Sequence, residues 1–234
     1  MKNNPNKNFS IPTIEVVVDN NKFFLPQSSV HRPACKAFLN NRYFEPNTHE
    51  LIKAILAKKP GNLIHAGTFF GDMLPSFAKA CGEKNKLYAF EPILEHFFLS
   101  KKVIEVNSLS NVFLFCAGLS DKLDLVKMQT SVNNVKLGGG SRISNIGDET
   151  VCTISIDQLG IENLSCIQLD VEGHELSALK GALNTIEEYK PIILIEDNEK
   201  NCHHFLLSID YIFVGQIPGL SIWQYKKENL FRSK

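Results

Sequence analysis

Apolar residues form short continuous runs at regular intervals along the chain, and most of the segments between them can hold a helix. The runs lie at 62–66, 86–90, 112–116, 151–156, 165–169 and 191–195. Short apolar runs of this kind are typical of strands buried on both faces of a parallel sheet. Strands that alternate with helices predict an α/β fold with a doubly wound, mostly parallel sheet.

The beginning of the chain follows a different pattern. Residues 14–18 and 22–25 are β-like and flank Asp19-Asn20-Asn21, which predicts a β-hairpin. A helix is predicted at 47–58, with Asn47 or Thr48 as its N-cap. We therefore divide the chain into an N-terminal extension with a β-hairpin, residues 1–46, and one catalytic domain, residues 47–234.

Two later segments also depart from the alternation. Residues 127–150 are rich in Ser, Asn and Gly, which predicts a long loop, and its glycine-rich part at 136–145 is expected to be a mobile flap. Two β-like runs at 211–214 and 220–225 surround Pro218-Gly219. They predict an antiparallel C-terminal hairpin that closes one edge of the sheet.

Charge and composition narrow the classes of partner. The chain has 25 Lys and Arg against 25 Asp and Glu, so no overall field attracts nucleic acid or an anionic membrane. No apolar run approaches the ~20 residues that cross a bilayer, and the polar N-terminus lacks a secretory signal. The six scattered cysteines predict buried thiols rather than disulfides. We expect a cytoplasmic protein.

The turn after the first run can hold a ligand. Ala66 to Asp72, with Thr68 and Phe69 between Gly67 and Gly71, joins a strand to a helix. Glycines at such a turn let the backbone approach a ligand, although a plain tight turn explains them equally well. Glu91 and Pro92 end the second strand, where a carboxylate can accept hydrogen bonds from both hydroxyls of a ribose.

These signals fit either a dinucleotide or S-adenosylmethionine, because both contain an adenosine ribose. The turn lacks the third glycine of the dinucleotide pattern, so no pyrophosphate is expected. After the third strand, the small residues Ala117 and Gly118 leave room for an adenine ring. The alternative for this segment is a helix cap made by Ser120 or Asp121.

The densest polar cluster follows the run at 165–169. Asp170 emerges at the carboxyl end of that strand, and Gly173 permits a turn that brings His174 near it. A carboxylate and an imidazole suit removal of a proton from a hydroxyl, whereas the alternative is that Asp170 and Glu172 only cap the next helix. Glu196 and Asp197 end the next strand and either line the acceptor pocket or are solvated loop charges.

Four motifs in this order resemble the FkbM-type methyltransferases, a class I family that uses S-adenosylmethionine to methylate hydroxyl oxygens of sugars and secondary metabolites. They are Tyr-Ala-Phe-Glu-Pro at 88–92, Leu-Asp-Val-Glu-Gly-His-Glu at 169–175, Leu-Lys-Gly-Ala at 179–182 and Pro-Ile-Ile-Leu-Ile-Glu at 191–196. The resemblance implies that Gly67, Phe69 and Gly71 line the methionine part of the cofactor. It also implies that Glu91 holds the ribose and that Asp170 faces the transferred methyl group.

The chain differs from the family pattern at two positions. His65 stands where the family usually has an aspartate, and Phe69 where asparagine is common. Glu45 and Thr48, just before the first strand, are therefore our candidates for holding the amino and carboxylate groups of the cofactor.

The sequence thus predicts an S-adenosylmethionine-dependent O-methyltransferase whose acceptor is a hydroxyl group of a sugar, in a glycan or a glycosylated metabolite. Asp170 or His174 would be the base, with Glu196 beside them. A divalent metal bound by Asp170, Glu196 or Asp197 would replace simple base catalysis. Two further classes of protein fit the same motifs, a non-catalytic adenosine-binding module and an NAD-type oxidoreductase. Neither nucleic acid nor a membrane is expected as a partner.

Overall fold

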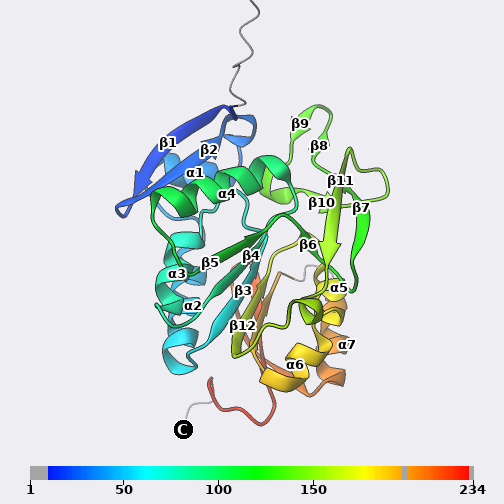
Figure 1. Ribbon diagram of the computed structural model, residues 1–234. Coiled ribbons are helices and arrows are strands. Elements are labelled where there is room, and N and C mark those ends of the chain that lie inside the picture. Colours follow the sequence, from blue (N-terminus) through cyan, green and yellow to red (C-terminus); the bar gives the residue numbers. More distant parts are fainter. Residues whose placement is uncertain (1–9, 197–199, 232–234) are drawn as a thin grey trace, which may run out of the picture.

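A seven-stranded sheet runs through the centre of the molecule in the computed structural model, which describes residues 10–196 and 200–231 (Figure 1). Its strand order is β14-β15-β13-β12-β3-β4-β5, and β15 alone is antiparallel to its neighbours. The strands are β3 (Asn62–Ala66), β4 (Leu87–Phe90), β5 (Val112–Phe115), β12 (Leu164–Leu169), β13 (Ile192–Ile195), β14 (Tyr211–Ile217) and β15 (Leu220–Tyr225). The predicted doubly wound α/β fold and its C-terminal hairpin are confirmed.

Helices cover both faces of this sheet. On one face lie α2 (Pro46–Lys58), α3 (Leu74–Cys81) and α4 (Leu94–Val106); on the other lie α5 (Glu175–Lys180), α6 (Leu183–Tyr189) and α7 (Asn201–Ser208). Side chains alternate between the two layers, so Leu63 packs with α2 and α3 while Ile64 packs with α5 to α7. Burial on both faces explains why these strands are apolar without interruption.

The start of α2 differs from the prediction. Glu45 is the N-cap residue, with φ +49°, and Pro46 occupies the first turn. Proline is favoured there because the first amides of a helix need no intrahelical acceptor. Thr48 is buried inside the helix and donates its hydroxyl to Glu45 Oε2 at 3.2 Å, so neither Asn47 nor Thr48 is the cap.

The predicted loop at 127–150 is wrong, and so is the placement of 151–156 in the parallel sheet. A second sheet with order β10-β7-β11-β6 is built from β6 (Gly118–Leu119), β7 (Asp124–Gln129), β10 (Arg142–Ile143) and β11 (Glu149–Ile154). Between β7 and β10 in the chain lie β8 (Ser131–Val132), β9 (Val135–Lys136) and a 3-10 turn, Gly138–Gly140. A short 3-10 helix, Ile156–Leu159, follows β11.

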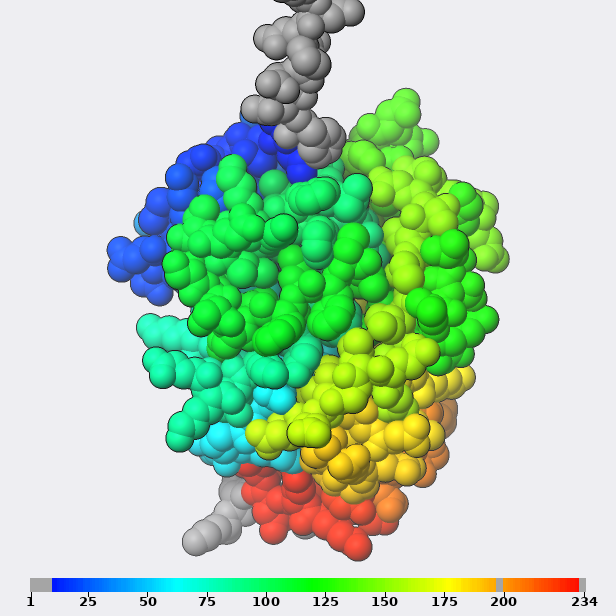
Figure 2. Space-filling view, in the orientation of Figure 1, coloured from blue at the N-terminus to red at the C-terminus, as the bar shows by residue number. Residues whose placement is uncertain are grey.

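The Ser, Asn and Gly residues that suggested a loop lie in turns and in a sheet with one solvent-exposed face. Asn133 and Asn134 both have positive φ and form the two-residue turn between β8 and β9. Asp148 accepts the amide and hydroxyl of Thr130 and the hydroxyl of Ser131, which ties the segment together. Figure 2 shows this part of the chain, green to yellow-green, along one side of the molecule.

The N-terminal hairpin is present as β1 (Thr13–Val18) and β2 (Asn21–Pro26), with Asp19 and Asn20 at positive φ in the turn. A 3-10 turn, Gln27–Ser29, and α1 (Pro33–Leu39) follow. Figure 1 shows this hairpin against α4, and its apolar cluster includes Phe69 and Phe70 of the first turn. The extension therefore supports the loop after β3. The domain boundary at residue 46 remains a prediction.

Two smaller expectations can be compared with the structure. The six cysteines form no disulfide in the described chain, but Cys116 is exposed rather than buried. None of the helices in the described ranges has the length and apolar character needed to cross a membrane.

Candidate active site

The carboxyl ends of β3, β4, β12 and β13 bring the predicted residues to one edge of the sheet, where open α/β sheets bind ligands. β3 and β12 approach most closely. A Cβ atom on Gly67, which has φ +94°, would lie 2.1 Å from the carbonyl oxygen of Asp170. Only glycine fits at this contact, and it places the first turn directly beside Asp170.

An apolar cavity of about 540 Å³ opens on one side of this contact. Its apolar walls are Phe90, Pro92, Ile93, Leu119, Met128 and Ile143, and Gly118 leaves space between them. The polar side chains that reach it include Glu91, His96, Asp170 and His174.

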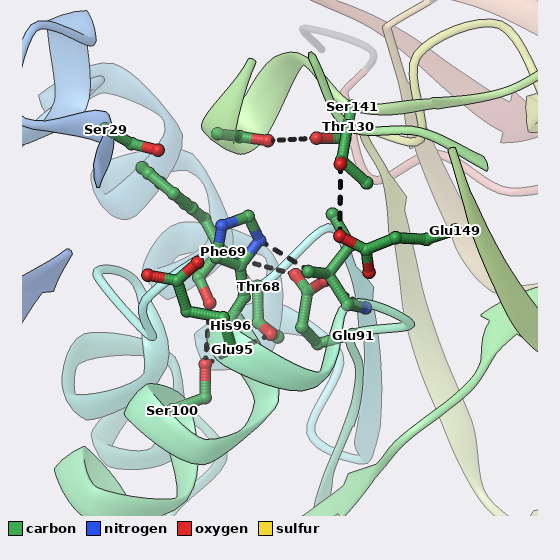
Figure 3. Close-up of polar contacts among 12 residues, drawn as sticks. Ser29, Thr68, Phe69, Glu91, Glu95, His96, Ser100, Thr130, Ser141 and Glu149 are labelled. Carbon is green, nitrogen blue, oxygen red and sulfur yellow. Dashed lines mark hydrogen bonds and ion pairs between the residues drawn. The ribbon is translucent and has the colours of Figure 1, made fainter. Parts of the chain in front are cut away.

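Glu91 is held by the backbone. Its Oε2 accepts the amide of Phe69 and its Oε1 the amide of Ile93, both at 2.9 Å, and His96 Nδ1 lies 3.6 Å from Oε1 (Figure 3). The residue is 4% exposed. A carboxylate has about four lone-pair positions, so two remain for hydroxyl groups of a ligand.

An acidic cavity of about 720 Å³ lies on the other side of Gly67. It is lined by five carboxyl groups and one guanidinium: Glu45, Asp72, Asp170, Glu172, Glu196 and Arg32. The two cavities share Gly67, Phe69, Gly139 and Asp170, so they form one continuous site. Asp170 is the titratable side chain that faces both.

Mutual repulsion and burial raise the pKa values of most of these carboxyl groups. The pKa of Asp170 is raised well above its ordinary value by burial and by a hydrogen bond to Glu196, which requires a shared proton. Burial and Glu45 raise the pKa of Asp72 to about 7. Burial also raises the pKa of Glu45 and of Glu172. The cavity therefore favours a cation.

Three of the acids are close enough to share an ion. Asp170, Glu172 and Glu196 each offer a carboxylate oxygen, and these oxygens lie within 4.8 Å of one another. Carboxylate oxygens are the ligands that Mg²⁺ and Ca²⁺ prefer. Asp197, which the sequence pairs with Glu196, lies outside the described residues.

His65 reaches the acidic cavity from β3. Its Nδ1 hydrogen-bonds to Gln168 Oε1 on β12, and burial lowers its pKa to about 4, so the ring is neutral. Within residues 10–196 and 200–231, His65 Nε2 is the buried side-chain nitrogen or oxygen without a hydrogen-bond partner. Such an atom is costly unless a ligand donates to it.

His174 lies apart from the acidic cavity. It precedes α5, its Nε2 is 3.0 Å from Ser120 Oγ, and it lines the apolar cavity only. Burial lowers its pKa. Glu175 accepts the amides of Val171 and Gly173, which fixes the turn between Asp170 and His174.

Four of the predicted cofactor residues do not line either cavity. Thr48 turns to Glu45 and Thr68 Oγ1 accepts from Ser100, so their hydroxyls are used inside the protein. Gly71 packs against Ser100 of α4, and Ala117 is buried outside both linings. Ser120 and Asp121 cap no helix, since Gly118–Leu119 is a strand followed by a turn.

Sequence reasoning missed several residues of the walls. Arg32 and Gly140 come from segments more than 100 positions apart, yet a Cβ on Gly140 would lie 2.6 Å from the Arg32 guanidinium. His96 could have been suspected, because it lies on the helix that begins just after Glu91. Nothing in the sequence around Arg32, Met128 or Ile143 pointed to a site.

The two cavities together suit S-adenosylmethionine, which the resemblance implies. An apolar cavity with two free acceptor positions on Glu91 fits adenine and its ribose. An acidic cavity with an unpaired acceptor on His65 fits the cationic sulfonium and ammonium groups. Gly67 and Asp170 mark the boundary between the two halves.

Comparisons with known proteins agree with this geometry. Hexuronic acid methyltransferase AglP from Haloferax volcanii is 28% identical over 130 residues, which are 53% of this chain and 52% of that protein. The chain thus spans about half the length of that relative. The crystal structure of methyltransferase FkbM from Methylobacillus flagellatus superposes with a TM-score of 0.54 at 20% identity, over 71% of this chain and 44% of that one.

At that identity the structural likeness shows the fold alone. The model of the FkbM methyltransferase domain, however, matches residues 65–212, more than half of the chain. The chain therefore belongs to the FkbM methyltransferase family.

Proposed function

We propose that this enzyme methylates a hydroxyl oxygen of a sugar and that the Asp170–Glu196 pair takes up the hydroxyl proton. The observation that carries the proposal is the position of Asp170. It lines both cavities, beside Gly67, so an acceptor hydroxyl next to Asp170 would meet the methyl group of a cofactor that spans the two cavities.

The cofactor supplies a methyl group already activated on a sulfonium, so the protein has mainly to position the acceptor and remove a proton. The acceptor oxygen forms the new C–O bond, the C–S electron pair stays on sulfur, and the proton passes to Asp170. A cation beside Asp170 favours its ionised form. Burial and Glu196 raise the pKa of Asp170, and with the cationic cofactor beside it Asp170 would ionise more readily and accept the proton.

Two features favour a sugar, and an acidic one in particular. The relative AglP is named a hexuronic acid methyltransferase. Arg32 is the guanidinium among the carboxyl groups of the acidic cavity, and a guanidinium binds a carboxylate in a planar, two-pronged fashion. Uronic acids are therefore the first acceptors to test.

The test is methyl transfer from labelled S-adenosylmethionine to a panel of free uronic acids, neutral hexoses, phenolic hydroxyls and a structured RNA. We expect label on the uronic acids. Transfer to phenols or RNA with none to any sugar would refute the sugar assignment. Product analysis by mass spectrometry and NMR identifies the methylated oxygen.

A second mechanism is favoured by one observation, the triad of Asp170, Glu172 and Glu196 oxygens within 4.8 Å. A divalent ion there would lower the pKa of the acceptor hydroxyl. Under this mechanism, chelator abolishes turnover and Mg²⁺ or Mn²⁺ restores it, while cofactor affinity is unchanged. Full activity after chelation leaves the Asp170–Glu196 pair as the base.

A further inference from the structure

A second hollow lies next to the acidic cavity, between α7 and the β14–β15 hairpin. This hairpin groove has a volume of about 1460 Å³, and its lining includes His203 and Leu207 of α7 and Phe213, Gln216 and Trp223 of the hairpin. None of these residues belongs to either cofactor cavity.

The groove begins where the acidic cavity ends. Ile195 lines the groove and the next residue, Glu196, lines the acidic cavity. On the opposite side, a Cβ on Gly219 of the hairpin turn would lie 3.5 Å from Glu45 Oε1, another wall of the acidic cavity. Glu45 and Glu196 thus form a common border between the acidic cavity and the hairpin groove.

The walls of the groove combine aromatic and polar groups. The Trp223 ring is buried, at 1% exposed, and lies 4.9 Å from the ring of His203 and 5.7 Å from that of Phe213, so it forms the buried middle of a row of three rings. Phe213 remains 49% exposed and Leu207 56% exposed. Apolar side chains left open beside an active site are typical of a binding surface.

The row of rings is held in place. Trp223 Nε1 donates to Ser221 Oγ at 3.0 Å, and Ser221 Oγ donates to the carbonyl of Ile195 at 3.2 Å. The pairing of β14 with β15 shifts between Phe213 and Gly215, a bulge of the kind that turns a side chain to a new direction. A rigid aromatic surface binds with little loss of conformational entropy.

We propose that the hairpin groove binds the sugar unit next to the one that is methylated, so that the natural acceptor is a glycan of at least two units. Pyranose rings have an apolar C–H face that packs on aromatic rings and a rim of hydroxyls that the Gln216 amide can bind. The inference rests on the proposed function, because it requires the acceptor sugar next to the Asp170–Glu196 pair.

The experiment compares Phe213→Ala with the wild type on glucuronic acid and on a panel of glucuronate disaccharides of different linkage. We expect at least one disaccharide to have a KM on the order of tenfold below that of the monosaccharide. Phe213→Ala should remove most of this advantage and leave the monosaccharide KM and the cofactor affinity unchanged. The control is Phe98→Ala on α4, which is similarly exposed, at 41%, and lines neither the cavities nor the groove.

A second readout needs no turnover. Trp223 is the single tryptophan of the chain, and it is buried beneath the groove against the rings of His203 and Phe213, so its fluorescence reports on changes in their packing. We expect disaccharides to change its emission saturably and glucuronic acid to change it little. Equal KM values for all sugars, with no emission change, would overturn the groove assignment while leaving sugar methylation intact. If no sugar is methylated, the proposed function fails, and the emission titration still decides whether the groove binds a glycan.

Discussion

The apolar and acidic cavities lie side by side at one sheet edge and share four residues, yet they hold their charges in opposite ways. In the apolar cavity, Glu91 is fixed by the amides of Phe69 and Ile93. In the acidic cavity, Asp72, Asp170 and their neighbours face one another, and burial and repulsion raise their pKa values.

This difference indicates that the apolar cavity serves recognition of the cofactor and the acidic cavity serves the chemical step. A carboxylate held by two backbone amides keeps one orientation, which suits a constant part of the ligand. Carboxyl groups with raised pKa values change protonation when a cation arrives, and such groups gather at catalytic positions. Substitutions in the apolar cavity should therefore change affinity, and those in the acidic cavity should change turnover and pH dependence.

The largest effect is expected for Asp170→Asn. The amide cannot take up the hydroxyl proton, and general-base assistance is typically worth ~100- to ~10,000-fold, so turnover should fall at least about 100-fold. Cofactor affinity should change less than about tenfold. Single-turnover assays and calorimetry measure the two quantities. Normal turnover in a folded variant would place the base elsewhere.

His174→Ala is the matched variant. Like Asp170, His174 lines the apolar cavity, but unlike Asp170 it does not line the acidic cavity. From the sequence we predict a loss as large as for Asp170→Asn. The contact with Ser120 gives a reason for a smaller loss, since it directs the ring away from the acidic cavity. A fall of about 100-fold would mean that His174 reaches the acceptor, whereas a severalfold fall would leave Asp170 as the base.

Glu91→Ala tests the apolar cavity. It removes a charged acceptor shared by two hydroxyls and frees the Phe69 and Ile93 amides, so cofactor binding should weaken by roughly 2–3 kcal/mol. Calorimetry with S-adenosylhomocysteine measures the loss. Glu95→Ala, in the first turn of α4 and outside both cavities, should bind normally. Unchanged affinity in a folded Glu91→Ala protein would contradict the ribose assignment.

Asp72→Asn should change how the stability of the protein depends on pH. The folded pKa of Asp72 is about 7, above its unfolded value, so this group lowers the free energy of unfolding as pH rises towards 7. Asparagine carries no charge, so the variant should gain a few degrees in Tm relative to wild type at pH 8, at about 2–4 °C per kcal/mol. At pH 4 the gain should vanish. A gain equal at both pH values would show that Asp72 is not buried as a charge.

The sequence was informative where local pattern and packing coincide. Strands β3, β12 and β13 of the central sheet are buried on both faces, so they had to be largely apolar, and glycine at Gly67 is required by the contact with Asp170. For the same reason, Asp170 and Glu91 could be placed at strand ends. Both side chains line the cavities.

The remainder depends on contacts between distant segments. The second sheet exposes one face, so apolar and polar residues alternate along its strands. The sequence of these strands therefore resembles that of a loop. Arg32 enters the acidic cavity only because the segment before α1 and the Gly138–Gly140 turn meet. Similarly, the pairing of His174 with Ser120 joins two strand ends whose spacing cannot be read from either segment.

The smallest effect concerns the segment at 136–145, which contributes to both cavities and which we predict to be a mobile flap. Gly138 and Gly139 pack on the Phe69 ring, which lines both cavities, and Ser141 Oγ donates to the carbonyl of Gly138. A ligand that spans the two cavities would contact these glycines. We therefore expect S-adenosylhomocysteine to slow amide exchange at 136–145 by several-fold, because bound ligand suppresses local opening.

Exchange in the buried strand β12 should not change, and neither should that of the Asn133-Asn134 turn, whose residues line neither cavity. Exchange in 136–145 as slow as in β12 without ligand, and unaffected by it, would mean that the segment is a fixed wall. Product release would then need another route out of the site.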